Sequence, residues 1–170
     1  MSQKMDMRSL LINDGSDAEC WILIAAAVCA GDLLVKHYID THKEENCHEP
    51  VVGGHIIITR FHNPGAMLGW MKDKPKMLMG VTILGIGVLA GGLMGSLYKK
   101  KSALIRLGLA LLLGGAASNA YDRIMKKEVT DYFRISIGSK RLERIIFNIG
   151  DMAIFIGGIL TAIGEIKESF

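Results

Sequence analysis

Carboxylates and amides recur where apolar segments meet polar sequence in the last third of the chain. Asn119 and Asp122 close one apolar segment, and Asn148 and Asp151 open the next with the same spacing. A further acid, Asp131, lies in the polar sequence between them. Ionisable groups are costly at the ends of helices that cross a membrane, and such a cost usually marks a functional site. These acids are therefore the first candidates for chemistry.

Two carboxyl groups in a poorly solvated site can hydrolyse a peptide bond. Burial and like charge raise the pKa of one group, so the pair tends to share a proton. The ionised carboxylate then takes a proton from water, and the neutral carboxyl donates one to the scissile carbonyl. On the residues alone, Asp122 and Asp151 form the expected pair. A proton or ion pathway uses the same residue types and remains an alternative.

Other polar side chains near these acids are suited to support them. Asn119 and Asn148 each precede an acid by three residues, so amide and carboxyl share a helical face and the amide can hold either substrate backbone or a carboxylate. Arg123 can clamp a carboxylate or a carbonyl. Asp32 and Lys36 lie one helical turn apart, either as a simple interfacial ion pair or as a pair that orients a group inside the bundle.

Four apolar segments must position these groups. Half of the residues are hydrophobic and the mean hydropathy is +0.31, which is typical of a small helical membrane protein. We predict a single integral-membrane domain over 1–170, with a polar, solvated tail at 1–19. The predicted spans are at about 20–39, 77–98, 104–121 and 147–164. The glycines of 77–98 predict that this helix packs tightly against its neighbours.

This topology brings the acids together. Four spans place the connector at 99–106 on one side of the membrane and the segments at 40–76 and 123–146 on the other. The four acids lie on or next to this second side, and we expect them to converge at one membrane level: Asp32, Asp122, Asp131 and Asp151.

The segment 40–76 also carries a predicted strand. The β-branched run at 55–61 ends in the turn Asn63-Pro64-Gly65. A short apolar patch at 67–71 follows, which predicts either a segment on the bilayer surface or ordinary packing under a loop.

Composition argues against several other functions. The net charge of +3 is small, and no basic helix with interleaved aromatics indicates nucleic-acid binding. Three cysteines without repeated spacing favour neither a disulfide framework nor a zinc site. The spacing of His42, Cys47 and His48 fits no common set of ligands, so we expect no metal and no cofactor.

Five motifs, in this order, resemble those of the lipoprotein signal peptidases (signal peptidase II). They are Asp32-Leu-Leu-Val-Lys36, Asn63-Pro64-Gly65-Ala66, Gly114-Gly-Ala-Ala-Ser-Asn119-Ala-Tyr-Asp122-Arg123, Val129-Thr-Asp131-Tyr-Phe133 and Phe147-Asn148-Ile-Gly-Asp151. The resemblance covers about 20–165. It implies an all-α intramembrane aspartic protease of the bacterial inner membrane. Four spans would carry a small extracytoplasmic β-cradle and an interfacial helix, with the active site near the extracytoplasmic face.

The resemblance also implies a substrate and residue roles. The substrate would be a prolipoprotein whose cysteine already carries diacylglycerol, and cleavage would occur before that cysteine. The catalytic pair would be Asp131 and Asp151 rather than Asp122 and Asp151. Supporting or substrate-binding roles would fall to other polar and turn residues of the motifs: Asp32, Lys36, Asn63, Gly65, Asn119, Asp122, Arg123 and Asn148. We expect a monomer.

Some positions depart from the family pattern. Ser118 stands for a glycine, Thr130 for a valine and Gly150 for an alanine, and the turn differs at Pro64, Met67 and Leu68. None of these changes removes a carboxylate. They leave substrate preference open, and with it two alternatives: a non-catalytic membrane protein that binds lipopeptides, or a small proton-coupled transporter.

The distribution of basic residues conflicts with this orientation. Lysines and arginines are more numerous on the side of the acids than in the tails and the connector, so the positive-inside rule would place the acids in the cytoplasm. We follow the resemblance, because loops with folded structure weigh less in that rule. We interpret the basic loop at 132–146 as a surface for membrane lipids, anionic ones in particular.

Overall fold

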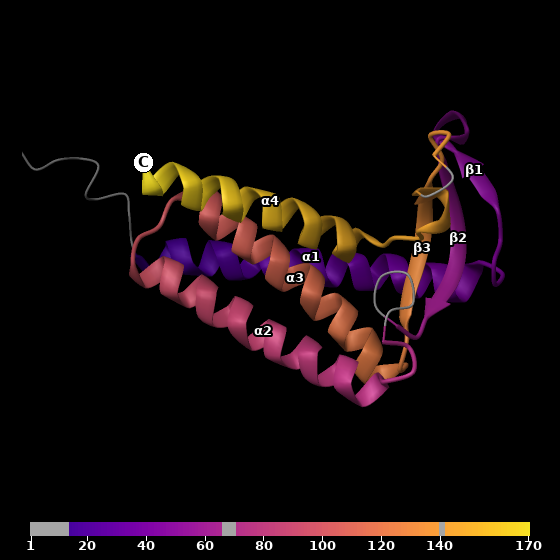
Figure 1. Ribbon diagram of the computed structural model, residues 1–170, viewed down its shortest axis with the longest axis horizontal. Helices are drawn as coiled ribbons and strands as arrows, with labels where there is room; N and C mark the ends of the chain where they lie inside the picture. Colours follow the sequence, from indigo (N-terminus) through magenta and orange to yellow (C-terminus); the bar gives the residue numbers. More distant parts are fainter. Residues whose placement is uncertain (1–13, 66–70, 140–141) are drawn as a thin grey trace, which may run out of the picture.

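A computed structural model of the chain describes residues 14–65, 71–139 and 142–170 (Figure 1). Four long helices run side by side, and a small sheet crosses one end of the bundle. The helices are α1 (Asp14–His42), α2 (Pro75–Tyr98), α3 (Ala103–Met125) and α4 (Ile149–Ser169). The strands are β1 (Glu49–Val51), β2 (Ile56–Asn63) and β3 (Val129–Ile135), and short 3-10 turns lie at η1 (Val52–Gly54) and η3 (Leu142–Arg144).

The four predicted spans are confirmed as helices long and apolar enough to cross a membrane. Their ends differ from the prediction. Helix α1 begins at Asp14, so part of the predicted polar tail is helical. Helix α3 continues past Asp122 to Met125. Helix α4 begins only after Asn148, whose extended backbone and side-chain cap fix the first turn.

The sheet is antiparallel, in the order β1-β2-β3. The predicted strand at 55–61 is confirmed as β2, with an irregularity in its register between Ile58 and Phe61. Beyond it, Phe61 pairs with Asp131. On its other side, β3 forms a bridge to Phe147, immediately before α4. Strand β3 therefore lies between the turn at the end of β2 and the start of α4. Most of the predicted surface segment at 67–71 lies outside the described residues.

Close helix packing occurs around α3, which lies between α2 and α4 in Figure 1. A Cβ atom at Gly115 would overlap the carbonyl group of Gly150 in α4, and one at Gly114 would lie 2.5 Å from the carbonyl oxygen of Ala25 in α1. Glycine is needed here because the backbones approach so closely. These contacts fix α1 and α4 against α3.

The prediction of tight packing through the glycines of α2 is wrong. A Cβ atom at most of these positions would meet nothing within 4 Å, and Gly92 alone among them approaches a neighbour, Leu109 of α3. Helix α2 packs against α3, and its buried residues are Leu78, Leu93 and Ser96 rather than its glycines. Glycine content predicts that a close approach is possible, but not which face of the helix is covered.

Candidate active site

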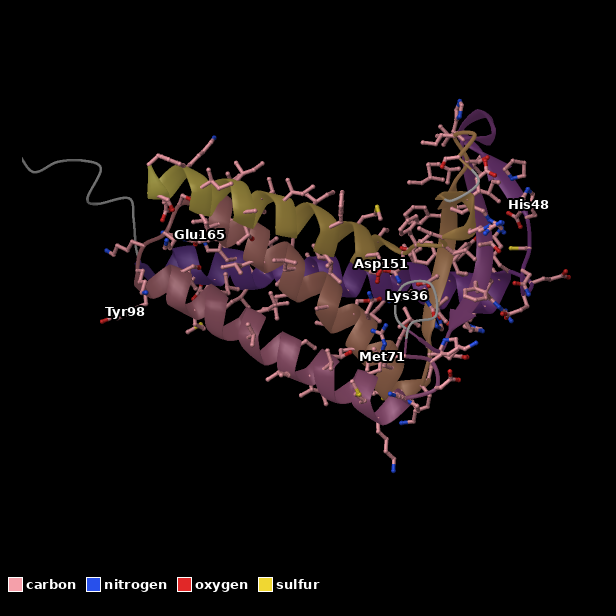
Figure 2. The ribbon with its side chains drawn as sticks, in the orientation of Figure 1. Lys36, His48, Met71, Tyr98, Asp151 and Glu165 are labelled. Carbon is pink, nitrogen blue, oxygen red and sulfur yellow. The ribbon has the colours of Figure 1, made fainter. Side chains whose placement is uncertain are left out.

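The acids converge at the end of the bundle that meets the sheet. Figure 2 shows Asp151 and Lys36 close together there, whereas Tyr98 and Glu165 lie at the opposite end. Asp32 and Asp122 are fully buried. The predicted convergence of four acids is therefore observed, but they form two pairs with different surroundings.

Asp131 is held by amide groups. It is 3% exposed, and its carboxyl accepts hydrogen bonds from Asn148 Nδ2 at 2.7 Å and Asn63 Nδ2 at 3.1 Å. The amide oxygen of Asn63 accepts a hydrogen bond from the backbone N–H of Gly65 at 3.0 Å. The turn after β2 thereby orients the Asn63 amide so that its N–H₂ group faces Asp131.

Asp151 occupies the third position of α4 and completes a capping box with Asn148. The Asn148 backbone N–H donates to Asp151 Oδ2 at 3.2 Å, and the Asp151 N–H donates to Asn148 Oδ1 at 2.8 Å. Asp151 Oδ1 accepts a further hydrogen bond from Asn119 Nδ2 at 2.9 Å. The residue that starts the helix thus also holds both carboxyls, because Asn148 contacts Asp131 through its side chain.

The other pair, Asp32 and Asp122, is bridged by a cation. The buried ammonium of Lys36 lies 2.9 Å from Asp32 Oδ2 and 3.3 Å from Asp122 Oδ2. It also donates to Ser118 Oγ at 3.0 Å. Of the two interpretations of Asp32 and Lys36, the simple interfacial pair is wrong, since both side chains are fully buried. A buried lysine needs such partners because an isolated charge is strongly disfavoured in the interior.

Asn119 connects the two pairs. Its amide oxygen accepts hydrogen bonds from Lys36 Nζ at 2.8 Å and from Asn148 Nδ2 at 3.1 Å. With the oxygen engaged in this way, the N–H₂ group of Asn119 faces Asp151. Lys36 therefore fixes the orientation of an amide that holds one carboxyl of the other pair.

Arg123 clamps carbonyl groups rather than carboxylates. Its guanidinium donates to the backbone carbonyl of Gly65 at 3.2 Å and to that of Asn119 at 3.3 Å. The predicted alternatives for Arg123 included both kinds of partner. The observed contacts tie the turn after β2 to α3, above the acids.

The environment of Asp131 suits proton exchange near neutral pH. Burial raises the pKa of the Asp131 carboxyl to about 7, and the negative charge of Asp151 acts in the same direction. The amides of Asn63 and Asn148 oppose this shift in part. Within the described residues, no ammonium or guanidinium forms an ion pair with Asp131 or Asp151. The pair can therefore share one proton. The described residues contain no group of three potential ligands that could hold a metal ion.

Comparison with known proteins assigns the chain to a family. The family model for signal peptidase (SPase) II matches residues 24–167. The chain belongs to the signal peptidase II family. It is 37% identical over 144 residues to the lipoprotein signal peptidase of Moorella thermoacetica, with 82% of this chain and 88% of that relative covered. It is 32% identical over 151 residues to the lipoprotein signal peptidase of Syntrophus aciditrophicus, with 87% and 92% covered.

Solved structures agree with this fold. A bacterial membrane enzyme determined by the in meso method at 2.3 Å resolution superposes with a TM-score of 0.78 at 28% identity, covering 89% of this chain and 90% of that one. A second such enzyme, at 1.9 Å resolution, gives a TM-score of 0.72 at 29% identity, covering 85% and 91%. Family and fold together identify a multi-pass membrane protein with signal peptidase II function. They do not favour a non-catalytic lipopeptide-binding protein or a transporter.

Some polar residues at this site were not among the predicted site residues. The hydroxyl of Tyr132 donates to Asp32 Oδ1 at 2.8 Å, and that of Ser118 donates to Asp32 Oδ2 at 2.6 Å. Asp40, at the end of α1, accepts from Thr130 Oγ1 at 3.0 Å and Lys126 Nζ at 2.7 Å. A serine, threonine or tyrosine in a sequence does not by itself indicate that its hydroxyl contacts a functional site. The one available clue was that Ser118 and Thr130 depart from the family pattern.

Proposed function

We propose that this signal peptidase II is an aspartic endopeptidase with Asp131 and Asp151 as its catalytic pair. One observation supports this choice above the others: Asn148 contacts both carboxyls, and no cation pairs with either within the described residues. The alternative pair from sequence alone, Asp122 with Asp151, is disfavoured because Asp122 contacts the ammonium groups of Lys36 and Lys126. A carboxylate that pairs with cations in this way stays ionised and is a poor proton donor.

The surroundings of the two acids suggest their roles. Asp151 lies in the first turn of α4, where the helix dipole favours a negative charge, so we assign it as the general base that activates water. Asp131, whose pKa is raised to about 7, is then the neutral carboxyl that donates to the scissile carbonyl. The remaining network holds these groups in place: Asp32, Lys36, Asn63, Gly65, Asn119, Asp122, Arg123 and Asn148.

The proposed substrate is a prolipoprotein with a diacylglyceryl-modified cysteine, cleaved immediately before that cysteine. The names of the two relatives, lipoprotein signal peptidase, support this class of substrate. The location of the pair at the end of four apolar helices also fits, because acyl chains can remain in the bilayer while the peptide bond reaches the acids. We place this face on the outside of the bacterial inner membrane, with the basic residues that follow β3 against anionic lipid, and we expect a monomer.

A cleavage assay tests the proposal. The purified protein is incubated with a diacylated prolipoprotein and, as a matched control, with the same prolipoprotein lacking the lipid. We expect a size shift from the lipidated substrate alone, with the new terminus at the modified cysteine. No cleavage by folded wild-type protein, or equal cleavage of both substrates, would contradict the proposed activity or its substrate class.

Orientation needs a separate test. Ser139→Cys introduces a label site on the sheet side, in a background where Cys20, Cys29 and Cys47 are replaced by serine. An impermeant thiol reagent added to intact cells should label the introduced thiol if the acids face outward. Labelling only after the cells are opened would place the acids in the cytoplasm.

A further inference from the structure

One side chain links the two elements that carry the proposed catalytic pair. Asp131 is in β3 and Asp151 is in α4, so their separation depends on how β3 is fixed to the start of α4. Tyr132 follows Asp131, and alternation along the strand directs it to the opposite face. The tyrosine is 4% exposed, so its hydroxyl needs partners inside the protein.

The Tyr132 hydroxyl has one partner on each side of it. It donates to Asp32 Oδ1 in α1 at 2.8 Å and accepts from the backbone N–H of Ile149 at 2.9 Å. Ile149 is the first residue of α4, whose N–H has no acceptor within the helix. The phenol therefore satisfies a free helix donor two residues before Asp151.

The acceptor on the other side, Asp32, is itself held by further partners. Asp32 Oδ2 lies 2.9 Å from Lys36 Nζ and accepts from Ser118 at 2.6 Å. Burial and the charge of Asp32 raise the pKa of the Tyr132 hydroxyl, so it keeps the proton that it donates. The result is a fixed chain of contacts from α1 through the phenol to the first turn of α4.

Backbone bonds alone do not provide this link. The N–H groups of Tyr132 and Phe133 donate to the Phe147 carbonyl at 2.9 and 3.0 Å, which joins β3 to the residue before the cap. They leave the first N–H of the helix itself without a partner. Among the described residues, the Tyr132 hydroxyl is what accepts the hydrogen bond of the Ile149 N–H.

We propose that Tyr132 is a positioning residue for the hydrolysis: its hydroxyl fixes the start of α4 against β3 and so sets the separation of the Asp131 and Asp151 carboxyls. The inference rests on the proposed catalytic pair. The two proposals fail in different ways. If Asp131 and Asp151 are not the catalytic pair, Asp131→Asn and Asp151→Asn retain cleavage; if only the Tyr132 link is wrong, those variants are inactive and Tyr132→Phe keeps the wild-type kcat.

Tyr132→Phe tests the link with the smallest possible change, since it removes one oxygen atom and keeps the ring. We expect kcat for a diacylated prolipoprotein to fall about 10- to 100-fold, the scale of a small misplacement of reacting groups, with KM nearly unchanged. The alkaline limb of the pH–rate profile should also move to lower pH. A wider separation weakens the repulsion from Asp151 that keeps Asp131 protonated.

Two controls separate this role from simpler ones. Tyr98→Phe removes a hydroxyl at the far end of the bundle, where the side chain is 89% exposed, and should match wild type. Ser118→Ala removes the other hydroxyl on Asp32, together with its contact to Lys36, but keeps the hydrogen bond from the Ile149 N–H to Tyr132, and should cost much less kcat than Tyr132→Phe. Equal losses of kcat from Ser118→Ala and Tyr132→Phe would overturn the proposal, because the effect would then come from the Asp32–Lys36 network and not from the contact with Ile149.

Hydrogen exchange provides a readout that does not depend on turnover. The peptide containing the Ile149 amide should exchange faster in Tyr132→Phe than in wild type, while peptides from the middle of α3 should not. A variant with a lower Tm but wild-type kcat, pH profile and exchange at Ile149 would overturn the proposal and leave Tyr132 a purely structural residue. A raised KM at unchanged kcat would also overturn it.

Discussion

Two pairs of buried acids lie side by side at the sheet end of this bundle, and they differ in what holds them. Asp32 and Asp122 share the ammonium of Lys36. Asp131 and Asp151 are held by the neutral amides of asparagines instead. A cation fixes a carboxylate in its ionised form, whereas amide donors orient a carboxyl and leave its proton exchangeable. The comparison teaches that the partner of an acid, more than its burial, decides whether it can act as an acid or a base.

The pairs also differ in the expected result of removing a charge. Loss of the cation from a buried ion pair leaves uncompensated charge and is strongly destabilising. Replacing one acid of the amide-held pair by its amide keeps the shape, and the remaining side-chain oxygen can still accept one of the two hydrogen bonds. Substitutions should therefore affect stability in one pair and catalysis in the other.

The largest expected effect is on cleavage. Asp131→Asn or Asp151→Asn should each lower kcat by roughly 10⁴-fold or more, as expected when a group that transfers a proton is removed. Both variants should remain folded, with a Tm close to that of wild type. Cleavage of the lipidated substrate and thermal unfolding are measured on the same preparations. Substantial cleavage by either variant would show that the acid replaced in it is not part of the catalytic pair.

The largest expected effect on stability comes from Lys36→Met. This change leaves Asp32 and Asp122 buried without their shared cation, and it should cost about 3–5 kcal/mol of unfolding free energy. Lys43→Met is the matched control, because Lys43 pairs with Glu49 in a more exposed position. Unfolding is followed in detergent. If Lys36→Met and Lys43→Met lowered the free energy of unfolding by similar small amounts, the contacts of Lys36 with Asp32 and Asp122 would not be important for stability.

The dependence on pH should distinguish the pairs as well. Cleavage should decline as pH rises through about 7, because Asp131 then loses the proton that it donates. Its raised pKa also means that the folded state binds a proton more tightly than the unfolded chain. Wild type should therefore lose stability relative to Asp131→Asn as pH rises from about 4 to about 7. A pH–rate profile measures the first effect, and unfolding curves at several pH values measure the second. If the free energies of unfolding of wild type and Asp131→Asn changed equally with pH, the predicted effect on stability would be wrong.

The smallest effect is expected at the glycine between the pairs. A Cβ atom at Gly150 would lie 2.8 Å from Asp32 Oδ2 and 3.0 Å from Asn148 Oδ1, so Gly150→Ala presses on both pairs at once. We expect a loss of about 1–3 kcal/mol in stability and a reduced rate. Gly158→Ala, on the same helix with nothing within 4 Å, should be neutral or slightly stabilising. If Gly150→Ala and Gly158→Ala had the same stability and the same rate of cleavage, the two pairs of acids would not be closely packed around Gly150.

Sequence reasoning predicted the four helices and the convergence of the acids, because apolar length and alternating topology determine both. It did not predict which acids pair. Two cations contact Asp122: Lys126, one helical turn further along at the end of the same helix, and Lys36 in another span. The contact with Lys36 cannot be predicted from spacing within the Asn119–Asp122 motif. Only the resemblance moved the catalytic role to Asp131, and the observed contacts of Lys36 give a physical reason for that choice.

The polar link through Tyr132 was beyond sequence reasoning for a related reason. Its partners, Asp32 and the N–H of Ile149, lie in two other elements, and neither contact follows from the position of a tyrosine beside an acid. Sequence reasoning also did not predict which glycines lie at close contacts between helices. Both α2 and α3 contain several glycines, but the glycines of α3 meet α1 and α4, while most of those in α2 meet no neighbour.

The open glycine positions of α2 have a consequence for how the protein sits in a bilayer. With 24 residues, α2 is about 36 Å long, which exceeds a hydrocarbon core of about 30 Å. A helix longer than the core tilts or thickens the lipid around it. Helices α3 and α4 are fixed to each other through close backbone contacts at Gly108, Gly115 and Gly157, whereas α2 can change its angle while acyl chains fill the space beside its glycines. Hydrophobic mismatch in thinner or thicker membranes should therefore be taken up first by the tilt of α2, leaving the two pairs of acids at their separation.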